Sequence, residues 1–268
     1  MEMTDIVRIT SKDNLQLRYA MTLHDRKTAE SQGVVFLEGV RLCEDALYSG
    51  ISPLSIYFNT SKETLVAAWC ERFSYSSQTK LFHLPDPLFA KLSSTKNPQG
   101  VAIIAKSPLI RNDIPIRGND LYLVCEETSD PGNLGTMIRM ADAFDFTAVI
   151  VISGCVDPFN EKVLRASMGS CFHIPIVSFP DIDSAIFQLQ KIGVQLVASH
   201  LDGQDISKYE YTFPVALFIG NEARGLSEEC AKQCDVLAKI EMPGKAESLN
   251  ASSAASIFGY VLNQYRNK

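Results

Sequence analysis

The chain has 268 residues, 46% of them hydrophobic, and a formal net charge of -6. No stretch approaches the roughly 20 consecutive apolar residues of a membrane-spanning helix, and residues 1–10 carry charges instead of the apolar segment of a signal peptide. The composition therefore excludes a protein with helical membrane spans and predicts a soluble protein of the cytoplasm, long enough for two domains.

The first part of the chain alternates between apolar, strand-like runs and helical stretches. Strands are predicted at 34–37, 54–58, 80–84 and 101–105, and helices at 41–48, 62–73 and 87–92. This pattern predicts a small α/β domain over residues 1–107. That domain carries 12 basic and 11 acidic side chains, against 13 and 20 in the rest of the chain, so a basic patch for a nucleic acid would form there more readily.

Residues 108–120 contain two prolines, one glycine and little periodicity, which is typical of a linker. Beyond it, short apolar and mostly uninterrupted runs predict strands at 121–125, 148–152, 174–177, 195–198, 215–219 and 236–240. Helical segments separate these runs. The pattern predicts a second α/β domain, residues 121–268, in which helices cover both faces of a mainly parallel sheet and ligands bind beyond the carboxyl ends of the strands.

Polar segments follow three of these strands, and the first spans residues 133–139. Apolar side chains recur there at helical spacing and leave Arg139 at the edge of the apolar stripe. A guanidinium stays charged and offers five donors, so Arg139 could hold a phosphate or polarise a hydroxyl. It could equally be a solvated surface charge.

The second segment, residues 220–227, combines two glycines with Asn221, residues suited to positive φ angles and to a close backbone approach to a ligand. A turn into a helix capped by Ser227 explains part of the pattern equally well. Glu222 is a carboxylate in a tight glycine loop, and we expect it to pair with Arg139.

The third segment, residues 244–250, begins with Gly244 and Lys245 but is not a phosphate-binding P-loop, because Lys239 stands where that motif needs glycine. Ser248 begins a helix whose next residues are mostly small. Another backbone, from this chain or from a second subunit, can therefore pack closely against it.

Other chemistries find less support in the sequence. The seven cysteines and four histidines are scattered, and the closest cysteine pair, Cys230 and Cys234, lacks the spacing of a zinc site. We expect reduced thiols and no metal. Residues 93–96 have the serine–lysine spacing of penicillin-binding enzymes, but nothing else in the chain supports that chemistry, and a turn is predicted.

In order, spacing and strand context, the three segments resemble the motifs of the SpoU-type (TrmH-like) branch of the SPOUT RNA methyltransferases. The motifs N-x-G-x-x-x-R, G-x-E-x-x-G-L-S and I-P-M-x-G-x-x-x-S-L-N correspond here to residues 133–139, 220–227 and 240–250. Glu241 stands where the family usually has proline. Residues 36–41 and 95–100 resemble, less closely, the substrate-binding domain of the ribosomal RNA branch.

The resemblance implies a trefoil knot in the carboxyl part of the sheet, S-adenosylmethionine bound in that knot, and a homodimer whose subunits complete each other's sites. By matching positions, the adenosine part of the cofactor would contact Gly220, Ile240 and Leu249. The residues close by would be Asn221, Met242, Ser248 and Asn250.

The reaction that the resemblance implies is methyl transfer to a ribose 2′-hydroxyl of RNA, with ribosomal RNA the expected substrate. Such a reaction needs alignment and charge stabilisation, and no metal. Arg139 is the candidate catalytic residue, oriented by Asn133 and Glu222, and Arg41 and Lys96 are the candidate RNA contacts. A transfer RNA methyltransferase and a catalytically silent RNA-binding or ribosome-assembly protein on the same scaffold are the alternatives.

Overall fold

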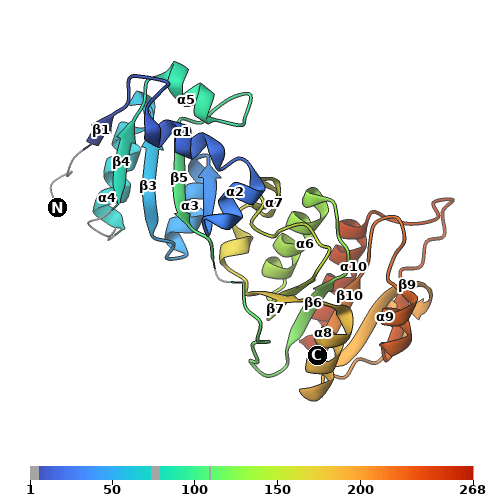
Figure 1. Ribbon diagram of the computed structural model, residues 1–268. Helices are drawn as coiled ribbons and strands as arrows, with labels where there is room; N and C mark the ends of the chain where they lie inside the picture. The colour runs from blue at the N-terminus through green and yellow to red at the C-terminus, as the bar shows by residue number, and fades with distance from the viewer. Residues whose placement is uncertain (1–5, 74–78, 109, 268) are drawn as a thin grey trace. The chain divides into compact units, whose positions relative to one another are not determined.

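The computed structural model describes residues 6–73, 79–108 and 110–267. Two compact units make up the chain (Figure 1): Met1–Pro108 with Phe159–Leu164, and Leu109–Pro158 with Arg165–Lys268. The short segment Phe159–Leu164 belongs to the first unit, although the sequence pattern places it in the second domain. The bounds of the predicted domains and of their linker otherwise stay a prediction. None of the helices within the three described ranges is both long and apolar enough to cross a membrane.

The first unit is built on a mixed five-stranded sheet with the order β1-β4-β3-β5-β2. β5 runs antiparallel to both of its neighbours, and the other pairs are parallel. The strands are β1 (Ile6–Arg8), β2 (Val34–Glu38), β3 (Pro53–Phe58), β4 (Lys80–His83) and β5 (Val101–Lys106). The helices are α1 (Leu15–Thr22), α2 (Arg26–Ser31), α3 (Val40–Tyr48), η1 (Thr60–Lys62), α4 (Glu63–Arg72) and α5 (Asp86–Leu92), and α7 (Glu161–Ser167) begins in this unit.

The four strands and three helices predicted for this part of the chain are confirmed, with ends that differ by one residue. The sequence pattern does not predict β1, α1 or α2. α1 begins where the Asn14 side chain accepts the N–H groups of Gln16 and Leu17 at 2.9 and 3.3 Å. α2 begins where Asp25 accepts the N–H of Thr28 at 2.9 Å. Both helices are short, so they depend on these N-caps more than on apolar periodicity.

The second unit contains a six-stranded sheet with the order β11-β9-β10-β6-β7-β8, and all of its strand pairs are parallel. Its strands are β6 (Leu121–Cys125), β7 (Ala148–Ile152), β8 (Ile176–Phe179), β9 (Gln195–Asp205), β10 (Val215–Ile219) and β11 (Val236–Lys239). Its further helices are α6 (Pro131–Ala143), η2 (Ser170–Phe172), α8 (Ile182–Lys191), η3 (Ile206–Lys208), α9 (Glu228–Gln233) and α10 (Ala251–Arg266). The predicted α/β class and parallel sheet are confirmed, whereas the trefoil knot stays a prediction.

Each unit has its own apolar core. In the first, the rings of Tyr57 and Phe82 stack with centroids 4.9 Å apart inside a cluster that also contains Phe89 of α5. In the second, the buried strand residues include Ile150 and Phe218, which belong to one cluster with residues of α8 and α9. Burying each such side chain stabilises the fold by about 1.5–3 kcal/mol.

Five of the six strands predicted for the second unit lie within two residues of their predicted bounds, but β9 runs seven residues past the predicted end at 198. Its extension pairs with β11 after a register shift between Leu237 and Ala238. A Cβ on Gly203 would meet the backbone of Leu237 at 2.5 Å, so only glycine allows this approach. The extension is largely polar and none of its residues is buried, so it has no apolar pattern that would predict a strand.

The strand order reverses at the junction of β6 and β10. The chain passes from β6 outward to β7 and β8, and then crosses to the other side of β6 for β10, β9 and β11. β10 and β6 pair in register from Val215↔Leu121 to Ile219↔Cys125, so both strands end at the same level. The loops that follow them therefore begin next to each other, at the point of a doubly wound sheet where ligands bind.

Candidate active site

Glu126, the first residue after β6, joins the two loops at the strand ends. Its backbone N–H donates to the carbonyl of Ile219 at 2.9 Å. Glu126 is only 7% exposed. Its carboxylate accepts hydrogen bonds from the N–H and the hydroxyl of Ser227 at 2.9 and 2.7 Å. Ser227 also caps α9, because its hydroxyl accepts the N–H of Cys230 at 3.1 Å. Glu126 thus closes the 220–227 loop, a role that no pattern in the sequence indicates.

Gly220 and Asn221 shape the 220–227 loop from inside. Asn221 and Gly225 exchange backbone hydrogen bonds of 2.9 and 2.8 Å, and Gly225 has a φ of +73°, which favours glycine. The Asn221 side chain donates to the carbonyl of Glu127 at 2.9 Å. A Cβ on Gly220 would collide with the backbone of Gly225. Both residues therefore serve the conformation of the loop, and their predicted contact with the cofactor stays a prediction.

Glu222 faces the first turn of α6. Its carboxylate accepts hydrogen bonds from the Asn133 amide at 3.1 Å, the Asp130 N–H at 3.3 Å and the Ser129 hydroxyl at 3.4 Å. Burial would raise the pKa of the Glu222 carboxyl, but the hydrogen bonds from Asn133 and from backbone N–H groups outweigh it and lower the pKa below its ordinary value. Glu222 is therefore a carboxylate at neutral pH.

The predicted pair of Glu222 with Arg139 is wrong: among the described residues, no ion pair joins them. Arg139 is exposed on α6, and its Nη1 lies 3.0 Å from the sulfur of Met168. The helix explains the difference. Arg139 follows Asn133 by six residues, which places it about 9 Å further along the helix axis and on another side of the helix. The carboxylate held at Asn133 is therefore out of its reach.

Asn133 and Asn250 connect all three loops. Asn250 donates its amide to the side-chain oxygen of Asn133 at 2.9 Å, while Asn133 donates to Glu222. Asn250 is also the N-cap of α10, where its oxygen accepts the N–H groups of Ser252 and Ser253 at 2.9 and 3.2 Å. Asn133 itself is buried, with 9% of the residue exposed. The predicted convergence of the three segments is confirmed by this chain of hydrogen bonds.

The third segment and the residues just before it also carry apolar side chains. Ile240 and Met242 are half-buried, Leu249 is 39% exposed, and Ser248 is exposed. Lys239 Nζ lies 3.4 Å from the carboxylate of Glu241, so the glutamate that replaces the family's proline faces a lysine. Within the described ranges, no group of three or more His, Cys, Asp and Glu side chains could hold a metal ion.

The two candidate RNA contacts lie on neighbouring segments of the first unit. Arg41 is exposed in the first turn of α3, with its Nε 3.9 Å from the carboxylate of Asp45. Lys96 is exposed in the loop that leads into β5. The segments meet because the Gln99 side chain accepts the N–H of Val40 at 2.8 Å.

Known proteins resemble the chain in both units. Residues 120–260 match the SpoU rRNA Methylase family, and residues 14–103 match the MRM3-like substrate binding domain. A 23S rRNA guanosine-2′-O-methyltransferase of Bacillus subtilis is 30% identical over 256 residues, which is 95% of this chain and 98% of that protein. A 23S rRNA uridine-2′-O-methyltransferase of Streptomyces viridochromogenes is 28% identical over 94% of this chain and 90% of its own length.

Solved structures show the same architecture. The AdoMet-bound rRNA methyltransferase of Sinorhizobium meliloti superposes with a TM-score of 0.84 at 29% sequence identity, and the match covers 97% of this chain and 98% of that one. The SpoU methyltransferase AviRb of Streptomyces viridochromogenes, in complex with AdoMet, gives a TM-score of 0.83 at 27% identity, over 95% and 99% of the two chains.

Proposed function

The chain belongs to the SpoU rRNA methylase family, and we propose from this membership that it transfers a methyl group from S-adenosylmethionine to a ribose 2′-hydroxyl of RNA. The observation that carries the proposal is the hydrogen-bond chain from Asn250 through Asn133 to Glu222, which draws the three loops together. Loops that meet at this point of a parallel sheet are where such folds bind nucleoside-containing ligands.

The residues of the third loop fit the proposed cofactor. The half-buried side chains of Ile240 and Met242, together with the exposed Leu249, offer apolar contacts to an adenine ring, while Ser248 and Asn250 offer polar groups. Gly220 and Asn221 hold the facing loop in shape. S-adenosylmethionine, when bound, supplies a methyl group on a positively charged sulfur.

Arg139 is the residue that we propose to act on the ribose. The chain has to align the 2′-oxygen with the methyl carbon and stabilise the negative charge that develops as the hydroxyl proton leaves. Arg139 is exposed, its guanidinium stays charged, and its described partner is the weak acceptor sulfur of Met168. Asn133 and Glu222 act as positioning residues for the loops rather than for Arg139.

Ribosomal RNA is the substrate that we propose, because the two relatives described above modify 23S rRNA and residues 14–103 match a substrate-binding domain. One relative acts on a guanosine and the other on a uridine, so the family likeness leaves the base open. We place the activity in the cytoplasm, where seven free cysteines would stay reduced.

A homodimer is part of the proposal. α10 packs on α6, where a Cβ on Gly259 would collide with the Met140 side chain. Ile257 and Tyr260 of the same helix are 39% and 54% exposed, and Leu249 lies just before it. The close packing expected of the small residues after Ser248 stays a prediction, and the exposed apolar side chains of α10 suit a second subunit.

Replacing Arg139 tests the proposed chemistry. Wild-type protein should transfer labelled methyl groups from S-adenosylmethionine to unmodified ribosomal RNA, and Arg139→Ala should lower kcat about 100-fold or more, as removal of one charge-stabilising donor does. Cofactor affinity, measured by calorimetry, should stay unchanged. Arg111→Ala, another exposed arginine of this unit that pairs with Asp113 outside the three loops, is the matched control.

Three outcomes would count against the proposal. Full activity of Arg139→Ala would remove this residue from the chemistry. Methylation of transfer RNA but not of ribosomal RNA would replace the substrate. If the protein binds RNA but shows no affinity for S-adenosylmethionine, it is a catalytically silent RNA-binding protein and not an enzyme.

A further inference from the structure

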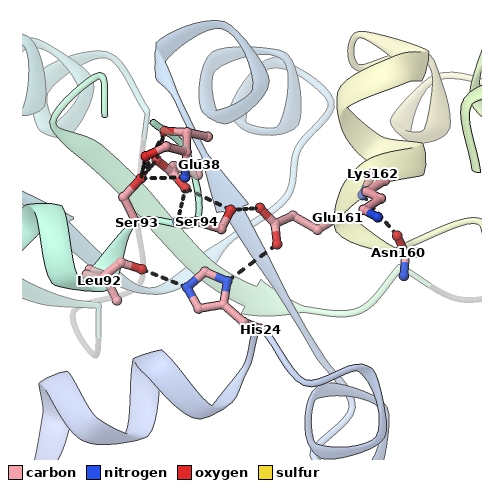
Figure 2. A network of polar contacts seen from close by, with 9 residues as sticks. His24, Glu38, Leu92, Ser93, Ser94, Asn160, Glu161 and Lys162 are labelled. Atoms are coloured by element: carbon pink, nitrogen blue, oxygen red, sulfur yellow. Dashed lines mark hydrogen bonds and ion pairs between the residues drawn. The ribbon is translucent and has the colours of Figure 1, made fainter. Parts of the chain in front are cut away.

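Glu38, the last residue of β2, is a buried carboxylate that holds an exposed loop. The residue is 7% exposed. Its carboxylate accepts hydrogen bonds from the Ser93 hydroxyl and from the Ser94 N–H at 3.1 Å (Figure 2). It also accepts one from the Thr95 hydroxyl at 2.9 Å. Every one of these donors belongs to the segment that follows α5. We call residues 93–97 the 93–97 loop.

A second carboxylate holds the same loop from another direction. The Ser94 hydroxyl also donates to Glu161 at the start of α7, and Glu161 lies 3.4 Å from Nδ1 of His24. His24 Nε2 donates to the carbonyl of Leu92 at 2.6 Å, just before the loop (Figure 2). The beginning of the loop is therefore tied to β2 and to α7, and Leu92 just before it is tied to His24, between α1 and α2.

The end of the loop is fixed as well. Gln99 accepts the N–H of Val40, and the N–H of Asn59 donates to the carbonyl of Gly100 at 3.0 Å. Gly100 has a φ of +79°, and the side chain of Asn59 occupies the space where a Cβ would lie. A conformation that favours glycine and a close neighbour thus set the turn into β5.

Between these anchors, Lys96 and Asn97 are exposed. No ion pair of Lys96 is found among the described residues, and Arg41 is exposed on the segment that Gln99 joins to the loop. A buried carboxylate is costly unless it is hydrogen-bonded, and a plain surface turn does not need one. Its use here fixes the shape of a loop that presents a free cation, and a fixed shape lowers the entropy lost on binding.

We propose that Glu38 is a positioning residue for RNA: it holds the 93–97 loop in the conformation in which Lys96 contacts the phosphate backbone of the substrate. This inference rests on the proposed RNA substrate. It assigns a function to the serine-rich turn that the reaction itself does not use, and it predicts that Glu38 acts on RNA only through the loop.

RNA affinity and its salt dependence test the proposal. Binding of unmodified large-subunit ribosomal RNA is measured over a range of salt concentrations for wild type, Lys96→Ala, Glu38→Ala and the double variant. Lys96→Ala should weaken binding about three- to tenfold and reduce the slope of log K against log salt by about one. Glu38→Ala should weaken RNA binding and reduce the salt slope by at least the same amounts. The double variant should bind no more weakly than Glu38→Ala alone, because both changes remove one contact.

Conservative variants separate positioning from stability. Glu38→Gln keeps an oxygen that accepts the Ser94 N–H, and its amide N–H groups can donate to the hydroxyls of Ser93 and Thr95 once these rotate. This variant should therefore retain most of the RNA affinity. Thr95→Val removes one hydrogen bond to Glu38 with little change of shape, and it should lower RNA affinity while the protein stays folded. Lys80→Ala, an exposed lysine at the other end of the sheet, should leave binding unchanged.

The proposal is overturned if Glu38→Ala and Thr95→Val both melt earlier but bind RNA with the wild-type slope. It is also overturned if the double variant loses RNA affinity by the product of the two single-variant fold losses, because the two residues would then act independently. Should Glu38→Ala fail to fold, Thr95→Val and Glu38→Gln decide the question alone. Failure of the proposed function would look different, since wild-type protein would then transfer no methyl group, whatever the binding of these variants.

Discussion

Glu126, Glu222 and Glu38 show what single carboxylates do in this protein. Each lies in or beside a polar loop, and each accepts hydrogen bonds from another segment: from Ser227, from Asn133 and from the 93–97 loop. Hydrogen bonds to a charged group are worth about 1.5–3 kcal/mol each, about twice the usual value. These side chains therefore hold loops in place, while Arg139 and Lys96, the residues proposed to contact RNA, remain exposed.

Glu222 should make the stability of the site depend on pH. Its folded pKa is lowered below the ordinary 4.5 by Asn133 and backbone N–H groups, which outweigh the effect of burial. A lowered folded pKa gives stabilisation that is complete above pH 4.5 and is lost as the pH falls through the folded value. By calorimetry, the Tm of wild type should therefore be higher than that of Glu222→Gln at neutral pH, and this difference in Tm should shrink below pH 4.5.

Because Glu222 is largely exposed, the difference in Tm at neutral pH should be small, about 2 °C or less. Glu247→Gln provides the control, since Glu247 is an exposed carboxylate of the third loop. The Tm of Glu247→Gln should equal that of wild type at every pH. A gap between wild type and Glu222→Gln that persists or widens in acid would contradict the assigned sign.

At the scale of secondary structure elements, Gly220 is a position of the 220–227 loop that has no room for a side chain. A Cβ there would collide with the backbone of Gly225 and Leu226, which cannot turn aside as a flexible side chain can. Gly244 of the third loop has open space around it. Gly220→Ala should therefore weaken S-adenosylmethionine binding at least tenfold, or about 1.4 kcal/mol, and Gly244→Ala should have little effect.

Calorimetric titration with the cofactor measures both glycine variants under the same conditions. The far-UV circular dichroism of Gly220→Ala should remain that of wild type, because the collision is confined to the loop. Equal cofactor affinities of the two variants would show that the conformation of the 220–227 loop does not matter for binding.

The elements that the sequence predicts well are those whose side chains are buried. The strands of the parallel sheet are runs of apolar residues, and both of their faces are covered, so β6, β7 and β10 match their predicted bounds. α1, α2 and the extension of β9 escape prediction because N-caps and backbone pairing hold them. Neither feature leaves an apolar period in the sequence.

The candidate site is predicted in part for the same reason. Parallel strands end at one edge of the sheet, so loops that follow β6 and β10 have to meet, and they do. The pairing of Glu222 with Arg139 is wrong because it depends on the side of α6 on which each residue lies. The sequence also does not distinguish Glu126, which turns inward, from an exposed carboxylate such as Glu127, which pairs with Arg224.

At the scale of the whole molecule, the two units divide the proposed work. The second unit holds the three loops with the residues proposed for the cofactor and for the ribose. The residues proposed to contact RNA, in the 93–97 loop and at Arg41, belong to the first unit. RNA affinity and methyl transfer should therefore respond to different variants: Lys96→Ala should raise KM, whereas Arg139→Ala should lower kcat.

The last prediction concerns a second copy of the chain. Ile257 and Tyr260 lie three residues apart on one side of α10, and both remain exposed although the helix packs on α6. Light scattering should give wild type twice the 29.6 kDa mass of one chain, and Ile257→Asp should shift it towards the single-chain mass. Because the subunits are expected to complete each other's sites, cofactor affinity should fall with the loss of the dimer.

Phe187→Asp is the matched control for this surface, since Phe187 is 63% exposed on α8, outside the proposed interface. It should leave both the mass and the cofactor affinity unchanged, because it exchanges an exposed apolar side chain for the same charge outside the proposed interface. If wild type transfers methyl groups at concentrations where light scattering finds only single chains, each active site is complete within one chain, and the exposed side of α10 has some other role.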